Sequence, residues 1–327
     1  MKQHRFEVVE GSLVPGVYSH FCSINEQLCS HTYYGLRHPA GVFNVGKNSV
    51  SIGLSDVLDE LHSWQPKPEE ELTPSILLNK YKKLLFDFQK YYESGYEILM
   101  GFCGKHTPPR GKEFYYEWLR DNGYACGKHY SDLVRGNSDF LFFRDLNDKL
   151  KHTSDDLRCV TFDAENGRTI GYYLETAHSD GSIGPNESFH PRYKGYHTAN
   201  SFNFDLRRLY FTFYLVSDAL LESLKQHIEQ NYSGKVFKIA VEVRGTEQLS
   251  DVYKKIMELP DEHFPSEFGR SLKYVSRVTT KTGTKYLIFE KNRAKNRSLE
   301  GRFKLVTSGD GHSKTFRIPF LGSQRGL

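Results

Sequence analysis

Two long stretches of the chain repeat apolar residues at steps of three and four. The first begins after Thr73 and Pro74, and its apolar residues are Leu77, Tyr81, Leu84, Leu85, Phe88, Tyr91, Tyr92, Tyr96 and Leu99. The second lies within 203–231 and contains Leu206, Leu209, Tyr210, Phe213, Val216, Leu220 and Leu224. This spacing puts apolar side chains on one face of a helix, which must be buried against a partner. With further helical segments over 113–120 and 138–152, the sequence predicts a central helical bundle.

The bundle is interrupted by an insert between its third and fourth helices. Residues 158–163 and 168–175 alternate between apolar and polar side chains around an Asn-Gly pair, a pattern typical of a β-hairpin. The stretch 178–200 is rich in Gly, Pro, His and Ser, and we expect it to be a long ordered loop of the kind that is often functional.

The segments on either side of the bundle are expected to contain strands. In residues 1–70 we expect strands at 5–9 and 14–21, a hairpin over 41–54 and a short helix over 55–64. A proline-broken polar run at 65–71 marks the boundary with the bundle. After Gly234 the pattern predicts a strand at 235–243, a helix at 246–259 and strands at 272–280, 284–290, 302–307 and 314–319.

The sequence therefore predicts an α+β protein in three parts. These are a small β-rich N-terminal region (1–70), a helical bundle with an inserted β-hairpin (71–234) and a basic α/β C-terminal domain (235–327). A chain of 327 residues is long enough for two or three cores, because single cores rarely grow past about 250–300 residues.

Charge is distributed unevenly along the chain. Residues 270–327 hold fourteen Lys or Arg against three acidic residues, a net charge of +11, so the total of +4 leaves −7 for the rest. A basic segment beside an acidic body indicates a polyanionic partner.

Aromatic residues lie between the cations of this segment, an arrangement that can track phosphates and stack bases. The densest cations, which we take as candidate nucleic-acid contacts, are Lys291, Arg293, Lys295 and Arg297. The alternative is a basic surface that docks on the acidic body of the same chain.

One short motif occurs twice, as Cys103-Gly104-Lys105-His106 and as Cys126-Gly127-Lys128-His129. Thiolate and imidazole are ligands that suit tetrahedral Zn²⁺, and a two-residue spacing lets one turn present both. The candidate zinc ligands are therefore Cys103, His106, Cys126 and His129. In the alternative interpretation each glycine ends a helix, and the Lys and His lie at its negative end.

The third helical segment ends in a polar motif, Arg144-Asp145-Leu146-Asn147-Asp148-Lys149-Leu150-Lys151-His152. A helical bundle with Asn, four residues and His at a helix end resembles the HEPN superfamily, whose bundles often act as ribonucleases in toxin and defence systems. The family signature places an arginine directly before the polar residue. This chain keeps Asn147 and His152, has Leu146 at the position of the arginine, and offers Arg144 as the nearest one. The resemblance covers residues 73–231.

The resemblance implies a metal-independent ribonuclease. His152 would serve as general acid and base, because imidazole changes its charge near neutral pH. Arg144 or Asn147 would stabilise the charge that develops on the phosphate. The alternative is a solvated helix face, in which Asp145, Asp148 and His152 lie opposite the apolar residues of the same helix.

The chain shows no run of about 18 apolar residues that would span a membrane. No secretory signal is visible, and five cysteines are an odd and sparse number for a disulfide framework, so we expect a cytoplasmic protein with no membrane partner. A homodimer is left open.

Taken together, these features predict a nucleic-acid-binding intracellular effector that acts on RNA or DNA, and the resemblance implies a ribonuclease of a bacterial toxin or antiviral defence system. Two alternatives remain open. One is a non-enzymatic, zinc-containing scaffold or regulator. The other is a metal-dependent hydrolase that uses the loop at 178–197, whose candidate groups are Glu175, His178, Asp180, Glu187, His190 and His197.

Overall fold

The structure is a computed structural model of the chain. It describes residues 3–6, 8–9, 12–24, 28–64, 73–109, 114–164, 167–193, 196–232, 247–260, 264, 267, 271–280, 283–292 and 301–305. The protein is of the α+β class, as predicted, with long helices and small antiparallel sheets. None of the described helices combines the length and apolar character that crossing a membrane would require.

Eight helices lie within the described residues. They are α1 (Val17–Ser23), α2 (Pro39–Trp64), α3 (Pro74–Met100), α4 (Tyr115–Asp121), α5 (Ala125–Arg135), α6 (Ser138–His152), α7 (Phe202–Asn231) and α8 (Glu247–Glu258). The predicted helices at 73–99, 113–120, 138–152, 203–231 and 246–259 are thereby confirmed. The sequence patterns missed α5, which contains the second Cys-Gly-Lys-His motif.

Residues 39–64 form one continuous helix, so the hairpin predicted over 41–54 is wrong. Two glycines account for the difference. A Cβ atom at Gly46 would lie 2.9 Å from Cδ2 of Tyr91, and one at Gly53 would lie 3.1 Å from Cδ1 of Leu84. Both glycines therefore allow α2 to pack closely on α3. The strand predicted at 14–21 is also wrong, because α1 occupies most of this stretch.

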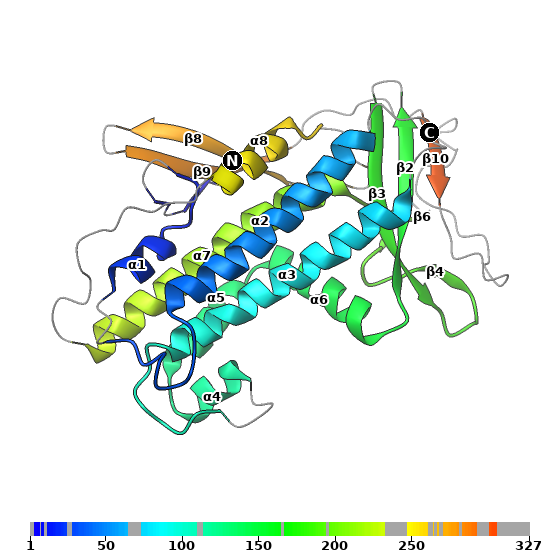
Figure 1. Cartoon of the computed structure of the whole chain (residues 1–327). Coiled ribbons are helices and arrows are strands. Elements are labelled where there is room, and N and C mark those ends of the chain that lie inside the picture. Colours follow the sequence, from blue (N-terminus) through cyan, green and yellow to red (C-terminus); the bar gives the residue numbers. More distant parts are fainter. Residues whose placement is uncertain are drawn as a thin grey trace.

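The helices α2, α3 and α7 run side by side along the length of the protein (Figure 1). Every residue from 202 to 214 of α7 is buried, which is typical of a helix surrounded by partners. The core is continuous from Phe6 through α1 and α2 to α8, and therefore crosses the predicted boundary near residue 70.

Strands lie at both ends of the described chain and in the insert. Their bounds are β1 (Gln3–Phe6), β2 (Asp156–Ala164), β3 (Gly167–Ala177), β4 (Ile183–Pro185), β5 (Arg192–Tyr193), β6 (Tyr196–His197), β7 (Asn200–Ser201), β8 (Ser271–Thr280), β9 (Gly283–Asn292) and β10 (Gly301–Leu305). The predicted hairpin of β2 and β3 is confirmed, as are the strands β8, β9 and β10. The strands predicted at 235–243 and 314–319 lie outside the described residues.

Two sheets join distant parts of the sequence. One has the order β1-β9-β8, in which Phe6 is registered with Tyr286. The other has the order β10-β2-β3-β4, with β7 also paired to β3, and it lies at one end of the long helices, with α4 at the opposite end (Figure 1). The C-terminal basic segment therefore contributes β10 to the sheet of the central insert.

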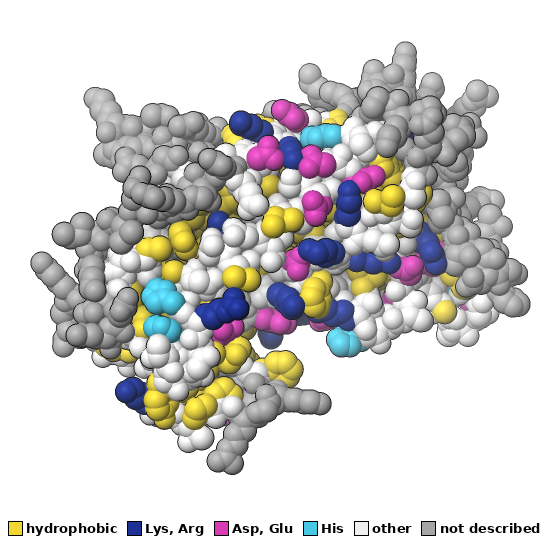
Figure 2. Space-filling model, in the orientation of Figure 1, with side chains coloured by type: hydrophobic (Ala, Val, Ile, Leu, Met, Phe, Trp, Pro, Cys, Tyr) yellow, Lys and Arg dark blue, Asp and Glu magenta, His cyan; other side chains and the backbone are white. Residues whose placement is uncertain are grey.

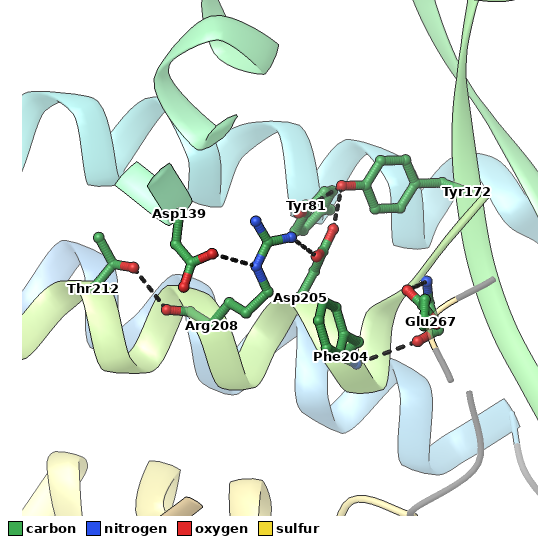
Figure 3. A network of polar contacts seen from close by, with 9 residues as sticks. Tyr81, Asp139, Tyr172, Phe204, Asp205, Arg208, Thr212 and Glu267 are labelled. Atoms are coloured by element: carbon green, nitrogen blue, oxygen red, sulfur yellow. Dashed lines mark hydrogen bonds and ion pairs between the residues drawn. The ribbon is translucent and has the colours of Figure 1, made fainter. Parts of the chain in front are cut away.

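The start of α7 carries a buried network of charged groups (Figure 3). Arg208 donates through Nη1 to Oδ1 of Asp205 at 2.7 Å and through Nε to Oδ1 of Asp139 at 2.9 Å. The second oxygen of Asp205 accepts a hydrogen bond from the hydroxyl of Tyr172 at 2.5 Å, and the Tyr172 hydroxyl lies 3.1 Å from that of Tyr81. The network thus connects α7 to α6, β3 and α3.

Electrostatics and packing both support this network. Asp205 is fully buried, and the Arg208 guanidinium lies 4.6 Å from the ring centroid of Phe142. Burial alone would lower the pKa of Arg208, but Asp205 and Asp139 outweigh it and raise that pKa above its ordinary value. Burial, and then the charge of Asp205, raise the pKa of Tyr172 well above its usual range, so Tyr172 stays a donor. All the charges of this network are therefore paired.

We expect Arg208→Leu to lower the free energy of unfolding by about 3–5 kcal/mol, because it leaves two carboxylates in the interior without their cation. Urea denaturation followed by circular dichroism measures the change. The control is Lys83→Ala, which removes an exposed ion pair with Asp87 four residues away on α3 and should cost about 0.5 kcal/mol or less. Equal losses in the two variants would contradict a structural role for the network.

Candidate functional site

The polar motif at the end of α6 is divided between the two sides of the helix. The helix begins after Asn137, whose Oδ1 accepts the backbone N–H of Phe140 at 2.9 Å, and it ends at His152. Phe140, Phe143 and Leu146 lie on its buried face. The apolar spacing that places these residues inside also determines where the motif residues lie.

Asn147 belongs to the buried face and His152 to the exposed one. Asn147 is 3% exposed, and its Nδ2 atom has no hydrogen-bond partner within the described part of the chain. His152 is exposed at the C-terminal end of the helix. Arg144 donates to Oδ1 of Asp145 through Nη2 at 2.6 Å and through Nε at 2.9 Å. The structure therefore exposes His152 to solvent and pairs Arg144 with the carboxylate of Asp145. Asn147 lies on the buried face of the helix and is therefore not part of the same exposed surface.

A cluster of one aromatic ring and two cations lies beside this helix end. Phe86, on α3, is 39% exposed. The ammonium nitrogen of Lys90 lies 4.7 Å from the centroid of the Phe86 ring, and that of Lys151 lies 4.5 Å from it. We call Phe86, Lys90 and Lys151 the Phe86 cluster. Lys151 directly precedes His152, so the cluster and the candidate base share the end of α6. Sequence reasoning missed this cluster, because Lys90 and Lys151 are 61 residues apart in the chain.

The surface around the cluster carries both cations and acids. Figure 2 shows Lys and Arg side chains along α3 on this face, with acidic and hydrophobic side chains between them. The last turn of α6 carries Lys149, Lys151 and His152. Cations at a helix C-terminus are favoured by the helix dipole, so this charge also has a structural benefit.

A groove of about 790 Å³ adjoins the cluster, since Lys90 contributes to its lining. Its walls come from α2, α3 and the region of α4, and Phe114 at its rim is 71% exposed. Burial raises the pKa of Glu97 in the groove, although the charge of Arg37 opposes this shift. A volume of this size is within the range of pockets that bind small ligands. The sequence patterns gave no indication of the groove, because residues 41–54 of α2 were taken for a hairpin.

The two cysteines of the repeated motif lie together, while the two histidines do not join them. Cys103 and Cys126 are buried, and the thiol of Cys103 donates to the carbonyl oxygen of Leu99 at 3.4 Å. His106 is exposed, with its ring centroid 5.5 Å from that of Tyr124, and Nε2 of His129 lies 3.6 Å from Glu222. Within the described residues, no group of three or more His, Cys, Asp or Glu side chains is arranged to hold a metal ion.

The third polar group at the cysteine pair is His227, from α7. Its Nε2 atom lies 3.2 Å from the carbonyl oxygen of Phe102. Hydrogen bonds from Cys103 and His227 lower the pKa of Cys126 to about 5, against the effect of burial. Burial lowers the pKa of His227, but Cys126 and the Phe102 carbonyl raise it above its ordinary value. His227 lies about 100 residues from the motif, so local spacing could not reveal it.

The loop at 178–197 gathers four of its candidate groups around one hollow. His178, Asp180, Glu187 and His197 line a depression of about 340 Å³. The other two candidates lie inside the protein. Nε2 of His190 accepts the backbone N–H of Leu174 at 2.7 Å, and Glu175 accepts from Nε of Arg158 at 2.8 Å. Both interactions support the β2–β3 hairpin.

The basic C-terminal candidates lie largely beyond the described residues. Lys291 lies on β9, where the structure describes the backbone, and its register partner is Leu272. Arg293, Lys295 and Arg297 lie outside the described residues. Comparisons of the whole chain with protein-family models, with curated proteins and with solved structures found no match.

The amide nitrogen of Asn147, which has no partner among the described residues, predicts how this position responds to substitution. We expect Asn147→Leu to leave the free energy of unfolding unchanged or to raise it by about 1 kcal/mol, because it replaces a buried unpaired group by an apolar one of similar shape. Asn147→Asp should lower it by about 3 kcal/mol, since it buries a charge without a partner. Urea denaturation of both variants decides the point. A loss of more than about 2 kcal/mol for Asn147→Leu would mean that the amide is bonded in solution.

Proposed function

We propose that this protein binds single-stranded nucleic acid, with RNA as the preferred strand, on the surface formed by the Phe86 cluster and the end of α6. In this proposal His152 acts on the bound strand as general acid and base. The basic C-terminal segment supplies long-range attraction for the phosphates. The proposal rests first on the Phe86 cluster and second on the distribution of charge along the chain.

The Phe86 cluster is the observation that carries the proposal. A base can stack on the Phe86 ring once it displaces one of the two ammonium groups that lie over the ring, and such stacking contributes about 1–3 kcal/mol per base. The two ammonium groups within 5 Å of the ring centroid can contact the phosphates on either side of a stacked base. Phe86 and Lys90 are one turn apart on α3, and Lys151 comes from α6, so the cluster is held by two packed helices.

The groove next to Lys90 supports a single strand rather than a duplex. A base extruded from a flexible strand could enter a space of about 790 Å³, whose lining includes Glu93 and Glu97. Carboxylates accept hydrogen bonds from the amino groups of bases, and they repel phosphates. The acidic groove and the basic cluster would therefore receive different parts of one nucleotide.

His152 supports cleavage through its place in this surface. Removing a proton from a ribose 2′-hydroxyl requires a base that can approach the strand, and His152 is exposed directly after Lys151. Arg144 can assist only if it exchanges the carboxylate of Asp145 for a phosphate, since it now donates two hydrogen bonds to Asp145. The resemblance to HEPN ribonucleases favours RNA over DNA as the substrate.

We expect Phe86→Ala to lower the affinity for a short single-stranded RNA about tenfold, because one stacked base is lost. Fluorescence anisotropy with a labelled oligonucleotide measures the affinity. The matched control is Ile76→Ala, which changes another exposed apolar residue of α3 and should bind as wild type. If Phe86→Ala and Ile76→Ala bind equally well, the cluster is not the binding surface.

The salt dependence of the same assay separates the two cationic regions. We expect the double variant Lys90→Ala and Lys151→Ala to reduce the slope of log K against log salt by about 1–2, and the quadruple Ala variant at 291, 293, 295 and 297 to reduce it by about 3. Lys128→Ala removes a lysine that is paired with Asp132 on α5 and should leave the slope unchanged. A salt-independent affinity of the wild type would exclude phosphate binding.

We expect His152→Ala to lower the rate of RNA cleavage about a hundredfold or more while binding is retained, as for the loss of a general base. The rate is measured with labelled RNA in the presence of EDTA, and the matching DNA strand tests the need for a 2′-hydroxyl. His178→Ala is the control, because His178 lines the loop hollow and not this surface.

The outcomes of that experiment distinguish the alternatives. Binding without cleavage by the wild type would favour the non-enzymatic scaffold or regulator. Cleavage that requires a divalent metal and is lost in His178→Ala would favour the hydrolase that uses the loop. Equal cleavage by wild type and His152→Ala in EDTA would remove His152 from the reaction.

A further inference from the structure

We propose that the groove of about 790 Å³ beside Lys90 is a guanine site, in which Glu97 and Arg37 contact two edges of one unpaired base. The proposal rests on the proposed function for the RNA strand, and it gives that surface a preference for one base. It follows from the residue types that α3, α4 and the segment before α2 bring to one cavity.

The groove lies toward the end of α3 that is nearest to α4, where α2 and α3 run side by side (Figure 1). Its lining on α3 extends from Asp87 to Glu97, so it begins beside the Phe86 cluster. Lys90 and Glu97 are seven residues apart on this helix, which is about 10 Å along its axis. One nucleotide can therefore keep its phosphate at Lys90 while its base points toward Glu97.

Glu97 is the acceptor that the groove leaves available. Its side chain is half-buried, and among the described residues it makes neither a hydrogen bond nor an ion pair. Glu93, one turn earlier, differs because it already accepts a hydrogen bond from Nε2 of Gln89 at 2.8 Å. An ionised carboxylate accepts through two oxygens and donates nothing, so it suits a base edge with two adjacent N–H donors.

Guanine is the base whose Watson–Crick edge carries two such donors, the N1–H and the N2 amino group. Adenine and cytosine each offer one amino group beside a ring nitrogen whose lone pair repels a carboxylate. The N3–H of uracil lies between two carbonyl oxygens, which repel a carboxylate as well. Since unpaired RNA bases are recognised on these edges, an ionised Glu97 selects guanine among the four.

Arg37 supplies the complementary contact. It lines the same groove from the segment before α2, and within the described residues it makes no ion pair. A guanidinium donates two parallel hydrogen bonds to O6 and N7 of guanine, and adenine presents an amino group in place of O6. Burial raises the pKa of Glu97, but the charge of Arg37 opposes this shift and so favours the ionised form that guanine needs.

Aromatic rings supply the wall of the site that comes from α4. The ring of Tyr116 packs edge-on against Tyr96, with 5.3 Å between the ring centroids, and Phe114 at the rim is 71% exposed. Aromatic side chains stack on bases with little regard to their identity. The aromatic wall therefore retains any base, while Glu97 and Arg37 decide which base is preferred.

Changes of single atoms in the RNA test the site. Fluorescence anisotropy compares short uridine-rich strands that carry guanine, hypoxanthine, adenine or cytosine at one central position. We expect the guanine strand to bind about tenfold more tightly than the others, as for one good bidentate contact. Hypoxanthine lacks only the N2 amino group, so its loss of affinity reports the hydrogen bond to Glu97.

Glu97→Gln keeps the size of the side chain but turns one acceptor into a donor. We expect this variant to lose the difference between the guanine and hypoxanthine strands. The matched control is Glu93→Gln, on the same wall of the groove, which should keep the full preference. Arg37→Lys removes the bidentate geometry and should lower the preference for guanine over adenine severalfold.

Equal affinity of the wild type for the guanine and hypoxanthine strands would overturn the guanine site and leave the RNA-binding surface in place. An unchanged preference in Glu97→Gln would overturn it too. If no RNA strand binds, the proposed function fails, and calorimetric titration with guanosine and inosine 5′-monophosphate tests the groove by itself. A preference for the guanine nucleotide that Glu97→Gln removes would then support the site, and equal or absent binding would overturn it.

Discussion

The ion pairs of Arg208 with Asp205 and Asp139 impose the strictest condition on this fold. Charges removed from water must find their partners with good geometry, since an unpaired one costs several kcal/mol. The partners here belong to α6 and α7, and Tyr172 of β3 and Tyr81 of α3 continue the hydrogen bonds. Apolar packing alone tolerates small shifts between helices. The network can form only when the helices and the hairpin are correctly positioned relative to one another. It therefore also fixes the positions of the nearby surfaces, including the end of α6.

The sequence predicted secondary structure best where a single physical cause, the burial of apolar side chains, determines the pattern. The stripes of α3 and α7 are long and periodic, so burial alone predicts them, and the alternation of β2 and β3 predicts their hairpin. Residues 41–54 were misread because glycine is found both in turns and at close contacts between helices. Here the glycines of α2 allow close packing on α3. Among the candidate sites, the cysteines were found by their repeated motif. His227 and the pairing of Phe86 with Lys151 depend on tertiary contacts, which no local pattern encodes.

The candidate binding surface needs exposed side chains on α3, whereas the cysteines near its end are buried. Phe86 and Lys90 are useful only if α3 keeps an aromatic ring and a cation exposed, at the expense of apolar burial. Cys103, just beyond the end of α3, is instead fully buried. The rigid helix supports both, because its buried stripe fixes the backbone and leaves the opposite face and the terminus available for chemistry.

The pairing of β1 with β9 has a consequence for how the chain reaches this structure. Phe6 contacts Phe211 and Tyr214 of α7, and its strand is registered with Phe289 through Tyr286. During synthesis β1 leaves the ribosome well before its partner strand, which is made some 280 residues later. Contacts of such high order close slowly, because a long loop must first be ordered. We therefore expect β1 to join its sheet late in folding, after the helices between it and β9 have assembled.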